Sequence, residues 1–349
     1  MDQLRDINDQ TFYDTVRPRL EQLEVVRQAK LAAYLFRRNI AIPLAALLTP
    51  PCAFLDWMLL RWQSGNEDGA AGVTVAVLGG LYYWVTQPKR QYAKAYKTDI
   101  LPQIARLFGN LIYEAEGKIP LGVLEPSKII PSHHRYSSED YFTGLYKGIK
   151  ITLSEIHLER RQRSGKRTTY HTVFKGLAVL IVMPREKFHG HTVLTENVSA
   201  FGKWFQKQSS GLKHADLVDL EFEKAFDVFT NDQVEARYLI DPAMIENLKS
   251  MRDVYRAKSF SAAYYKNQVL VMLPSTHNYF EPANIKIPAT DPQSIVSMKE
   301  ELGHILTLVD YLDVYDAVSL HEARKDGRLP PLEADATSQQ SQTPRRRIL

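Results

Sequence analysis

The stretch IAIPLAALLTPPCAFLDWMLL, from Ile40 to Leu60, is apolar along its length apart from one charged residue, Asp56. A helix of this length measures roughly 31 Å, and the hydrocarbon core of a bilayer is about 30 Å thick. Pro50 and Pro51 lie in mid-stretch, where proline removes a backbone donor and crowds the preceding turn, so we expect a kink. The stretch predicts a membrane-spanning helix.

A second apolar stretch, AAGVTVAVLGGLYYWV, runs from Ala70 to Val85 and is shorter than the usual span of about 20 residues. Its Gly79 and Gly80 would let two helices approach closely. Aromatic residues typical of headgroup level flank both stretches, namely Trp57, Trp62, Tyr82, Tyr83 and Trp84. We therefore expect a transmembrane helical hairpin. The alternative is a buried hairpin in a soluble core, where helices are rarely free of charge on all faces.

Charged residues set the expected orientation. Basic residues gather at the two outer ends of the stretches, namely Arg37, Arg38, Lys89, Arg90, Lys94 and Lys97, whereas the connecting loop sets Arg61 against Glu67 and Asp68. By the positive-inside rule both termini are cytoplasmic, so we expect a multi-pass membrane protein with a cytoplasmic soluble domain. The one cysteine, Cys52, lies in the first stretch, which leaves no disulfide framework and no thiolate metal site.

Amphipathic segments flank the two stretches. Residues 12–36 and 89–116 each carry an apolar stripe at helical spacing, interrupted in the second segment by Pro102. Because short helices need tertiary burial to persist, we expect the two segments to pair antiparallel as a stalk, through which an oligomer could also form. Two independent surface helices are the alternative.

Strands are expected after a connector at residues 114–138, which is rich in Gly, Pro, Ser and charge. A hairpin tip is expected at Arg163–Arg167, and a later hairpin should turn at Lys266 and Asn267. The β-branched and aromatic runs that predict strands are 142–148, 149–162, 168–184, 191–197, 217–229, 260–265 and 268–273.

The remaining elements are helices and a loop. Asp241 with Pro242, and Asp291 with Pro292, each combine an N-cap with a first-turn proline, so a helix should begin at each pair. Residues 203–214 read as a loop, with a helical turn at 201–205.

The expected fold class is α+β, with an N-terminal transmembrane helical hairpin and stalk followed by a mainly antiparallel β domain capped by a C-terminal helix. Its element order resembles a pleckstrin-homology-like barrel, and an ordinary α+β sandwich would give the same order. The expected domains are a cytoplasmic amphipathic helix (1–39), the transmembrane hairpin (40–87), a stalk helix and connector (88–128), a soluble α+β domain (129–325) and a disordered tail (326–349).

Two stretches are distinctive, TVFKGLAVLIVMP at Thr172–Pro184 and FTNDQVEARYLIDP at Phe229–Pro242. Together with the two-span N-terminus they resemble a family of uncharacterised bacterial membrane proteins, a domain of unknown function sometimes labelled galanin. The resemblance covers nearly the whole chain and is most specific at DQVEARYL. It implies a protein of the bacterial inner membrane and brings no activity with it. No residue supports the hormone relation in that label.

A net charge of +4 over 349 residues is small, which argues against a nucleic-acid partner. We expect a membrane-anchored cytoplasmic binding or scaffolding module, without a cofactor, that meets a protein partner at the bilayer and gains effective concentration from its anchor. The alternative is a membrane-tethered metal-dependent or acid/base hydrolase that uses His, Asp and Glu of the soluble domain. The sequence leaves enzyme activity open and favours its absence.

Candidate residues are few. His189 and His191 could be a metal pair, but Gly190 between them indicates a turn and no HExxH motif accompanies them, so we expect no metal site. Asp232 and Glu235 could form an acid/base pair, but they fit a capping box better. Catalytic residues stay unknown, and the binding or structural candidates are Asp232, Glu235, Arg237, Tyr238, Glu155 and His157.

Overall fold

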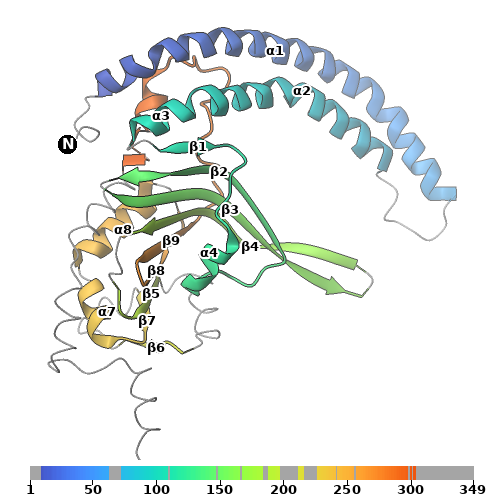
Figure 1. Cartoon of the computed structure of the whole chain (residues 1–349). Coiled ribbons are helices and arrows are strands. Elements are labelled where there is room, and N and C mark those ends of the chain that lie inside the picture. Colours follow the sequence, from blue (N-terminus) through green and yellow to red (C-terminus); the bar gives the residue numbers. More distant parts are fainter. Residues whose placement is uncertain are drawn as a thin grey trace, which may run out of the picture. The chain divides into compact units, whose positions relative to one another are not determined.

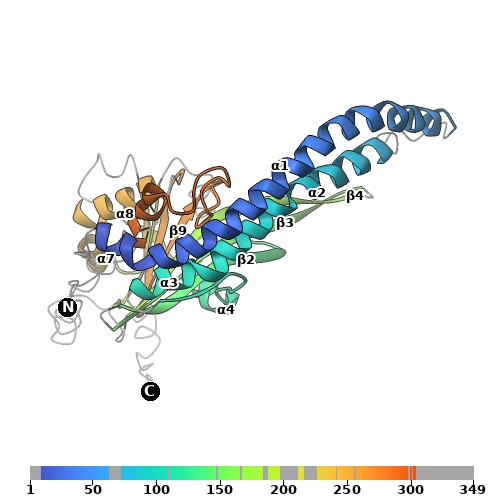
Figure 2. The ribbon, with the colours of Figure 1, turned by 90° about the horizontal axis from the view of Figure 1, so that it is seen from above.

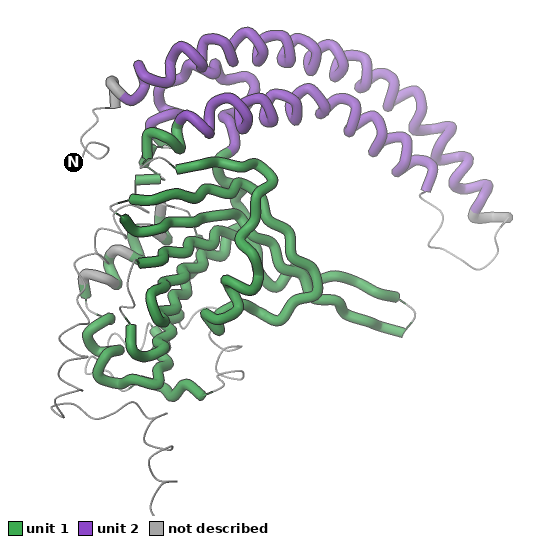
Figure 3. The backbone as a smooth tube through the Cα atoms, in the orientation of Figure 1, with its two compact units in different colours: residues 1–6, 104–280, 297–349 green, residues 7–103, 281–296 purple. Residues whose placement is uncertain are grey.

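The computed structural model describes residues 9–62, 72–108, 111–146, 148–165, 167–183, 188–196, 211–215, 226–240, 242–254, 257–297, 299–300 and 302–303. The chain divides into two compact units (Figure 3). The helical unit comprises residues 7–103 and 281–296, and the sheet unit comprises residues 1–6, 104–280 and 297–349. The chain therefore leaves the helical unit, builds most of the sheet unit, and returns once.

Two long helices, α1 (Asp9–Trp62) and α2 (Gly72–Asp99), dominate the helical unit and lie side by side (Figures 1 and 2). The first amphipathic segment and the first apolar stretch are thus one continuous helix. It runs on through Pro50 and Pro51, and Figure 1 shows a gradual bow along α1. A short helix, α3 (Leu101–Leu107), follows α2, and its second residue is Pro102. Proline is tolerated there because first-turn amides have no partner in their own helix.

The apolar stripes predicted for the stalk are buried. The exposed fraction is at most 5% for Phe12, Val16, Leu20 and Leu23 on α1, for Tyr92 and Tyr96 on α2, and for Ile100 directly after α2. Lys30 on α1 donates to Gln91 on α2 at 2.7 Å, so the two helices are also joined by polar contacts. Burial of this kind, rather than helix propensity, stabilises long helices in a protein.

Asp56 caps the start of α2 from the neighbouring helix. Its carboxylate accepts hydrogen bonds from the backbone N–H groups of Val73 (2.9 Å) and Thr74 (3.0 Å). The first amides of a helix have no intrahelical acceptor and carry partial positive charge, so a carboxylate is favoured there. Further along the pair, Arg37 donates to the carbonyl of Trp84 at 2.9 Å and to Gln87 at 2.7 Å. These bonds fix the register between α1 and α2.

The returning segment, residues 281–296, is attached to α1. Arg27 donates to the carbonyl of Ile285 at 2.5 Å, and the N–H of Ala289 donates to Glu24 at 2.7 Å. Glu24 and Arg27 also form an ion pair at 2.6 Å, with side chains only 17% and 7% exposed. One charged pair on α1 therefore holds a segment that lies more than 250 residues away in sequence.

The sheet unit contains an antiparallel sheet of nine described strands, whose neighbours follow the order β1-β2-β3-β4-β9-β8-β5-β7-β6. Within the described residues the sheet is open, with β1 and β6 at its edges, so the resemblance to a closed barrel is not confirmed. The strands are β1 (Ile112–Glu114), β2 (Arg135–Tyr146), β3 (Ile149–Ser164), β4 (Arg167–Val182), β5 (His191–Glu196), β6 (Lys213–His214), β7 (Phe226–Thr230), β8 (Ser261–Tyr265) and β9 (Gln268–Pro274).

Both faces of the central strands are buried. Consecutive residues of β4 from Leu177 to Ile181 are at most 3% exposed, which requires packing on each face. On one face a core cluster joins Ile156, Phe174 and Met272 to Leu124 of the short helix α4 (Leu121–Leu124). A 3-10 turn, η2 (Glu125–Ser127), follows α4.

Two helices lie between β7 and β8. The first, α7 (Gln233–Leu239), begins at Asp232, and the second, α8 (Pro242–Val254), begins at the predicted proline. Arg252 of α8 forms an ion pair at 2.6 Å with Glu196 at the end of β5, which docks α8 on the sheet unit. An α+β fold with a long N-terminal helix and a mainly antiparallel sheet is confirmed.

The two predicted hairpin tips are confirmed. Gly165, between β3 and β4, has φ of 58°, and Lys266, between β8 and β9, has φ of 53°. Residues 292–297 are helical, and Asp291 accepts the N–H of Ser294 at 3.1 Å, so the last predicted helix begins as expected.

The prediction that residues 114–138 form a connector, with strands beginning only after it, is wrong. That region holds α4, η2 and the first residues of β2, which begins at Arg135 rather than at residue 142. The first residues of β2 are mostly polar and lie partly in solvent, so they give no apolar signal. A bulge follows, in which Asp140 has φ of 53°, and it breaks the alternation of side chains that identifies a strand in the sequence. The predicted helical turn at 201–205, most of the strand at 217–229 and the tail after 326 lie outside the described residues.

The Glu24–Arg27 pair should make the helical unit sensitive to acid. The hydrogen bond from Arg27 outweighs burial and lowers the pKa of Glu24 from 4.5 to about 2. A carboxyl with a lowered folded pKa contributes stability that is complete above about pH 4.5 and lost as the pH falls toward about 2. Arg27→Met should therefore cost about 1–3 kcal/mol at neutral pH, and its deficit should shrink over that acid range.

Urea unfolding of the full chain in detergent, followed by helical circular dichroism, measures this effect. Arg17→Met is the matched control, because Arg17 and Glu21 form a similar pair on α1 with side chains more than half exposed. The control should change stability by less than about 0.5 kcal/mol. Equal losses in the two variants, or an Arg27→Met deficit that does not change with pH, would contradict the assignment.

Candidate functional site

One helix of the described residues is long and apolar enough to cross a membrane by length and composition. It is α1, with the qualifying region at Phe12–Leu59, and only 17% of its apolar window is buried inside the protein. The core helix of a soluble protein is mostly buried, so this helix differs from one. The structure thus supports an association with a membrane, while the second span stays a prediction.

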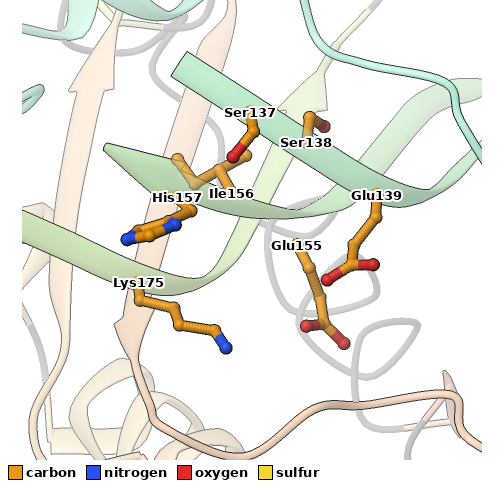
Figure 4. Close-up of a pocket in the computed structure, with 7 residues that line it drawn as sticks. All are labelled: Ser137, Ser138, Glu139, Glu155, Ile156, His157 and Lys175. Carbon is orange, nitrogen blue, oxygen red and sulfur yellow. The ribbon is translucent and has the colours of Figure 1, made fainter. Parts of the chain in front are cut away.

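A pocket of about 200 Å³ opens on strands β2, β3 and β4 of the sheet unit (Figure 4). We call it the β2–β4 pocket, and its lining residues are Ser137, Ser138, Glu139, Glu155, Ile156, His157 and Lys175. Strand register explains the gathering, because Ser137 pairs with His157, His157 pairs with Lys175, and Glu139 pairs with Glu155. Positions two apart on a strand share a face, so these five polar side chains line one surface.

Some polar side chains of this pocket are held by hydrogen bonds within the protein. Glu155 is 4% exposed, and its carboxylate accepts a hydrogen bond from the backbone N–H of Tyr279. The Nε2 atom of His157 lies 2.8 Å from Oγ1 of Thr172. Glu139 and Lys175 extend into the pocket from the two outer strands. The pocket can therefore offer a carboxylate and an ammonium group to a small polar ligand.

The Asp232 region is a structural junction. Asp232 is the N-cap of α7, as expected, and accepts the N–H of Glu235 at 3.1 Å. Glu235 is fully buried and accepts the N–H groups of His189 (2.9 Å) and Gly190 (2.6 Å) instead of closing a capping box. A Cβ atom at Gly190 would lie 2.6 Å from the Cβ of Asp232, so only glycine allows this approach.

The other candidate residues lie apart from one another. Arg237 and Tyr238 are exposed on α7, and Tyr238 is 61% exposed. His171 is exposed on β4, 3.2 Å from Thr169. The structure thus brings two pairs of the predicted residues together, Glu155 with His157 in the β2–β4 pocket and Asp232 with Glu235 at the start of α7. Within the described residues no group of three His, Cys, Asp or Glu side chains is placed to hold a metal ion.

Sequence reasoning missed Ser137, Glu139 and Lys175 as partners of Glu155 and His157. One signal was available in β3, where the face that carries Ile151 and Leu153 continues with Glu155 and His157. A switch from apolar to polar side chains on one face marks the place where a sheet face stops being core. The partners on β2 and β4 follow only from the strand register.

His191 is the first residue of β5, is half-buried and is held neutral. Its Nε2 lies 2.9 Å from the carbonyl of Ser127, and its ring stacks on Tyr265 with centroids 5.2 Å apart. Burial lowers the pKa of His191 from 6.5 to about 4. A histidine whose folded pKa is lowered makes the protein lose stability as the pH falls from about 6.5 toward about 4, because only the unfolded chain takes up the proton there.

His191→Gln should therefore flatten the pH dependence of unfolding between about pH 6.5 and 4, because glutamine does not titrate and can still donate to Ser127. The free energy of urea unfolding, measured across that range for both proteins, tests this. His171→Gln, at an exposed histidine, is the control and should leave the wild-type slope unchanged. An identical slope in the wild type and His191→Gln would refute the assignment.

Comparisons with known proteins add a family match. The family model described as Protein of unknown function (DUF3137) matches residues 172–314, about two fifths of the chain. This match supports the expected likeness to an uncharacterised domain of unknown function, while a bacterial origin stays a prediction. No curated protein matches the chain. Among solved structures, the crystal structure of the mycobacterial trehalose monomycolate transport factor A (TtfA) is 11% identical, covers 56% of this chain and 88% of that one, and has a TM-score of 0.28. A similarity of that size carries no argument about function.

Proposed function

We propose that the protein is a membrane-anchored binding or scaffolding module, held in a bacterial inner membrane by α1 and α2, with its sheet unit in the cytoplasm. The observation that carries the proposal is where large apolar side chains are exposed. On α1 and α2 they concentrate at Phe36, Ile40, Ile42, Leu47, Phe54, Leu55, Trp57, Met58, Leu59, Val75, Leu78, Tyr82, Tyr83 and Trp84. Elsewhere on the described surface such residues are few, namely Val25, Ile112, Leu145, Tyr238 and Ile287. A contiguous apolar surface of this extent is unfavourable in water and favourable in lipid.

Cations and aromatic rings mark one boundary of that apolar surface. The guanidinium of Arg37 lies 5.3 Å from the ring centroid of Trp84, and that of Arg90 lies 4.5 Å from Tyr83. Lys89 Nζ lies 4.1 Å from the ring centroid of Tyr34. Rings and basic side chains of this kind favour the headgroup level, and basic residues favour the cytoplasmic leaflet. This supports a two-span anchor whose outer ends face the cytoplasm.

The β2–β4 pocket is smaller than most sites for drug-sized ligands, so it does not carry a small-molecule function. Sites for drug-sized ligands usually measure about 300–1,000 Å³, and this pocket measures about 200 Å³. A binding module needs only an exposed surface, and its anchor raises its effective concentration for partners at the same membrane.

Hydrolysis, the alternative function, is favoured by one observation, the pairing of Glu139 with Glu155 near His157. An acid/base pair needs both carboxyl groups at the substrate. Glu155 instead accepts a hydrogen bond from the backbone N–H of Tyr279. Asp232 caps α7, and Glu235 accepts the N–H of Gly190 before β5. Binding is therefore the function that we propose.

Substitutions on α1 test the anchor. Leu47 is 71% exposed and Val25 is 70% exposed, and both lie on the same helix. An arginine in the middle of a span costs about 2.5–3.5 kcal/mol of insertion, so Leu47→Arg should lower the fraction of protein that resists carbonate extraction. Val25→Arg, in the stalk, should behave like the wild type. Release of the wild-type protein by salt alone, or equal extraction of the two variants, would overturn the anchor.

Reporter fusions test the orientation. A reporter that works only in the cytoplasm should be active when fused after Leu349 and silent when fused within residues 63–69, because the basic residues at both outer ends hold them inside. A reporter that works only in the periplasm should give the opposite pattern. A silent cytoplasmic reporter after Leu349, at normal protein levels, would put the sheet unit on the other side of the membrane.

A further inference from the structure

A two-stranded arm extends the sheet unit beyond its neighbouring strands. It consists of residues 159–164 of β3 and 167–172 of β4, which pair from Glu159 with Thr172 to Ser164 with Arg167. The pairing of β2 with β3 ends where Arg135 meets Glu159, and the pairing of β9 with β4 begins at Gly176, so neither neighbouring strand pairs with the arm beyond Glu159. Figures 1 and 2 show the two strands projecting from the sheet. Six residues of strand are roughly 20 Å long. We call this segment the arginine arm.

The arginine arm carries a charge equal to that of the whole protein. Residues 159–172 contain five Lys and Arg and one acidic residue, a net charge of +4, and the chain as a whole also has +4. Arg160, Arg161, Arg163 and Arg167 are all exposed. By strand alternation Arg161 and Arg163 lie on one face, and Arg160 and Arg167 lie on the other. Both faces are therefore basic.

The one acidic residue and the one tyrosine of the arm are both engaged at its base. Glu159 lies 3.9 Å from the guanidinium of Arg135, and that guanidinium lies 3.3 Å from the ring centroid of Tyr170. A register shift between Leu158 and Glu159 marks a bulge at the same level. Bulges increase local twist and turn a strand in a new direction. The base of the arm is thus built to direct a basic ribbon away from the sheet.

The composition of the arm decides between classes of partner. Residues 159–172 contain no aliphatic side chain and are mostly charged or polar, whereas the core of a protein interface is apolar and depleted in charge. Single-stranded nucleic acid needs aromatic faces on which bases stack, and the ring of Tyr170 is covered by Arg135. Exposed guanidinium groups suit phosphate, which they can bind with two parallel hydrogen bonds. A surface of phosphate groups matches these properties best.

We propose that the arginine arm binds the headgroup phosphates of anionic phospholipids at a membrane surface. This inference rests on the proposed anchor, which would tether the sheet unit, and with it the arm, to a membrane. Each basic residue near an anionic surface adds attraction that decays within a Debye length. Because its polar backbone edges cannot enter hydrocarbon, the arm lies among the headgroups without crossing them.

Vesicle capture by the full-length protein tests this proposal. The protein is reconstituted in nanodiscs of phosphatidylcholine alone and is immobilised through a C-terminal tag. The disc then contains no anionic lipid that could compete with the vesicles for the arm. It should capture vesicles of phosphatidylcholine with phosphatidylglycerol and leave vesicles of phosphatidylcholine in solution. Capture should fall steeply as salt rises from ~0.1 M to ~1 M, where the Debye length shortens from about 10 Å to about 3 Å.

Two matched variants assign the effect to the arm. Replacement of Arg160, Arg161, Arg163 and Arg167 by Gln should weaken capture about tenfold or more, given four charges of comparable weight. The control replaces four other exposed basic residues of the sheet unit by Gln, namely Lys118, Lys150, Lys213 and Lys258, and should capture vesicles like the wild type. Both variants should melt at the wild-type temperature, which shows that each is folded.

The outcomes separate this proposal from that of the anchor. Equal capture of both vesicle types, or undiminished capture by the Arg→Gln variant, overturns the lipid assignment while the protein remains in its disc. Tighter binding of a single-stranded RNA probe than of anionic vesicles also overturns it and makes the arm a nucleic-acid surface. A wild-type protein that stays in solution without disc or detergent overturns the anchor instead, and vesicle capture can then be measured on the free protein.

Discussion

The helical unit depends on one carboxylate that serves a neighbouring helix. Asp56 lies on α1, yet its two oxygens accept the first amides of α2, so a charge within an apolar stretch is matched by a helix terminus. Together with the bonds from Arg37 to Trp84 and Gln87, that bond sets the register of the pair. An aspartate that looks costly in the sequence becomes the contact that aligns the proposed anchor.

The same principle recurs in the sheet unit, where buried carboxylates bind backbone amides at joints between elements. Glu235 accepts two amides of the turn before β5, and Glu155 accepts the amide of Tyr279 after β9. Charge-assisted hydrogen bonds of this type are strong and directional, and an unpaired buried amide is costly. Acidic residues that looked available for catalysis in the sequence therefore have structural partners, which is why the geometry favours a binding role.

Local signals in the sequence predicted much of this fold, because they depend on neighbours in the chain. The stripe from Phe12 to Leu23, the tip at Gly165 and the cap at Asp232 are each set within about ten residues. The start of β2 was missed because its residues are polar and a bulge at Asp140 breaks the alternation. Two residues of the β2–β4 pocket, Glu155 and His157, were among the candidates chosen from the sequence. Glu139 and Lys175 were not, because only the strand register brings them beside β3.

The order of strands in the sheet has a consequence for synthesis on the ribosome. Strand β4 is complete at Val182, but its second neighbour, β9, begins only at Gln268. Because a ribosome adds about 5–20 residues per second, β9 is synthesised on the order of 4–17 s after β4. The segment 281–296, which closes the helical unit, emerges later still. Until β9 is synthesised, an apolar edge of β4 is therefore exposed to pairing with other nascent chains.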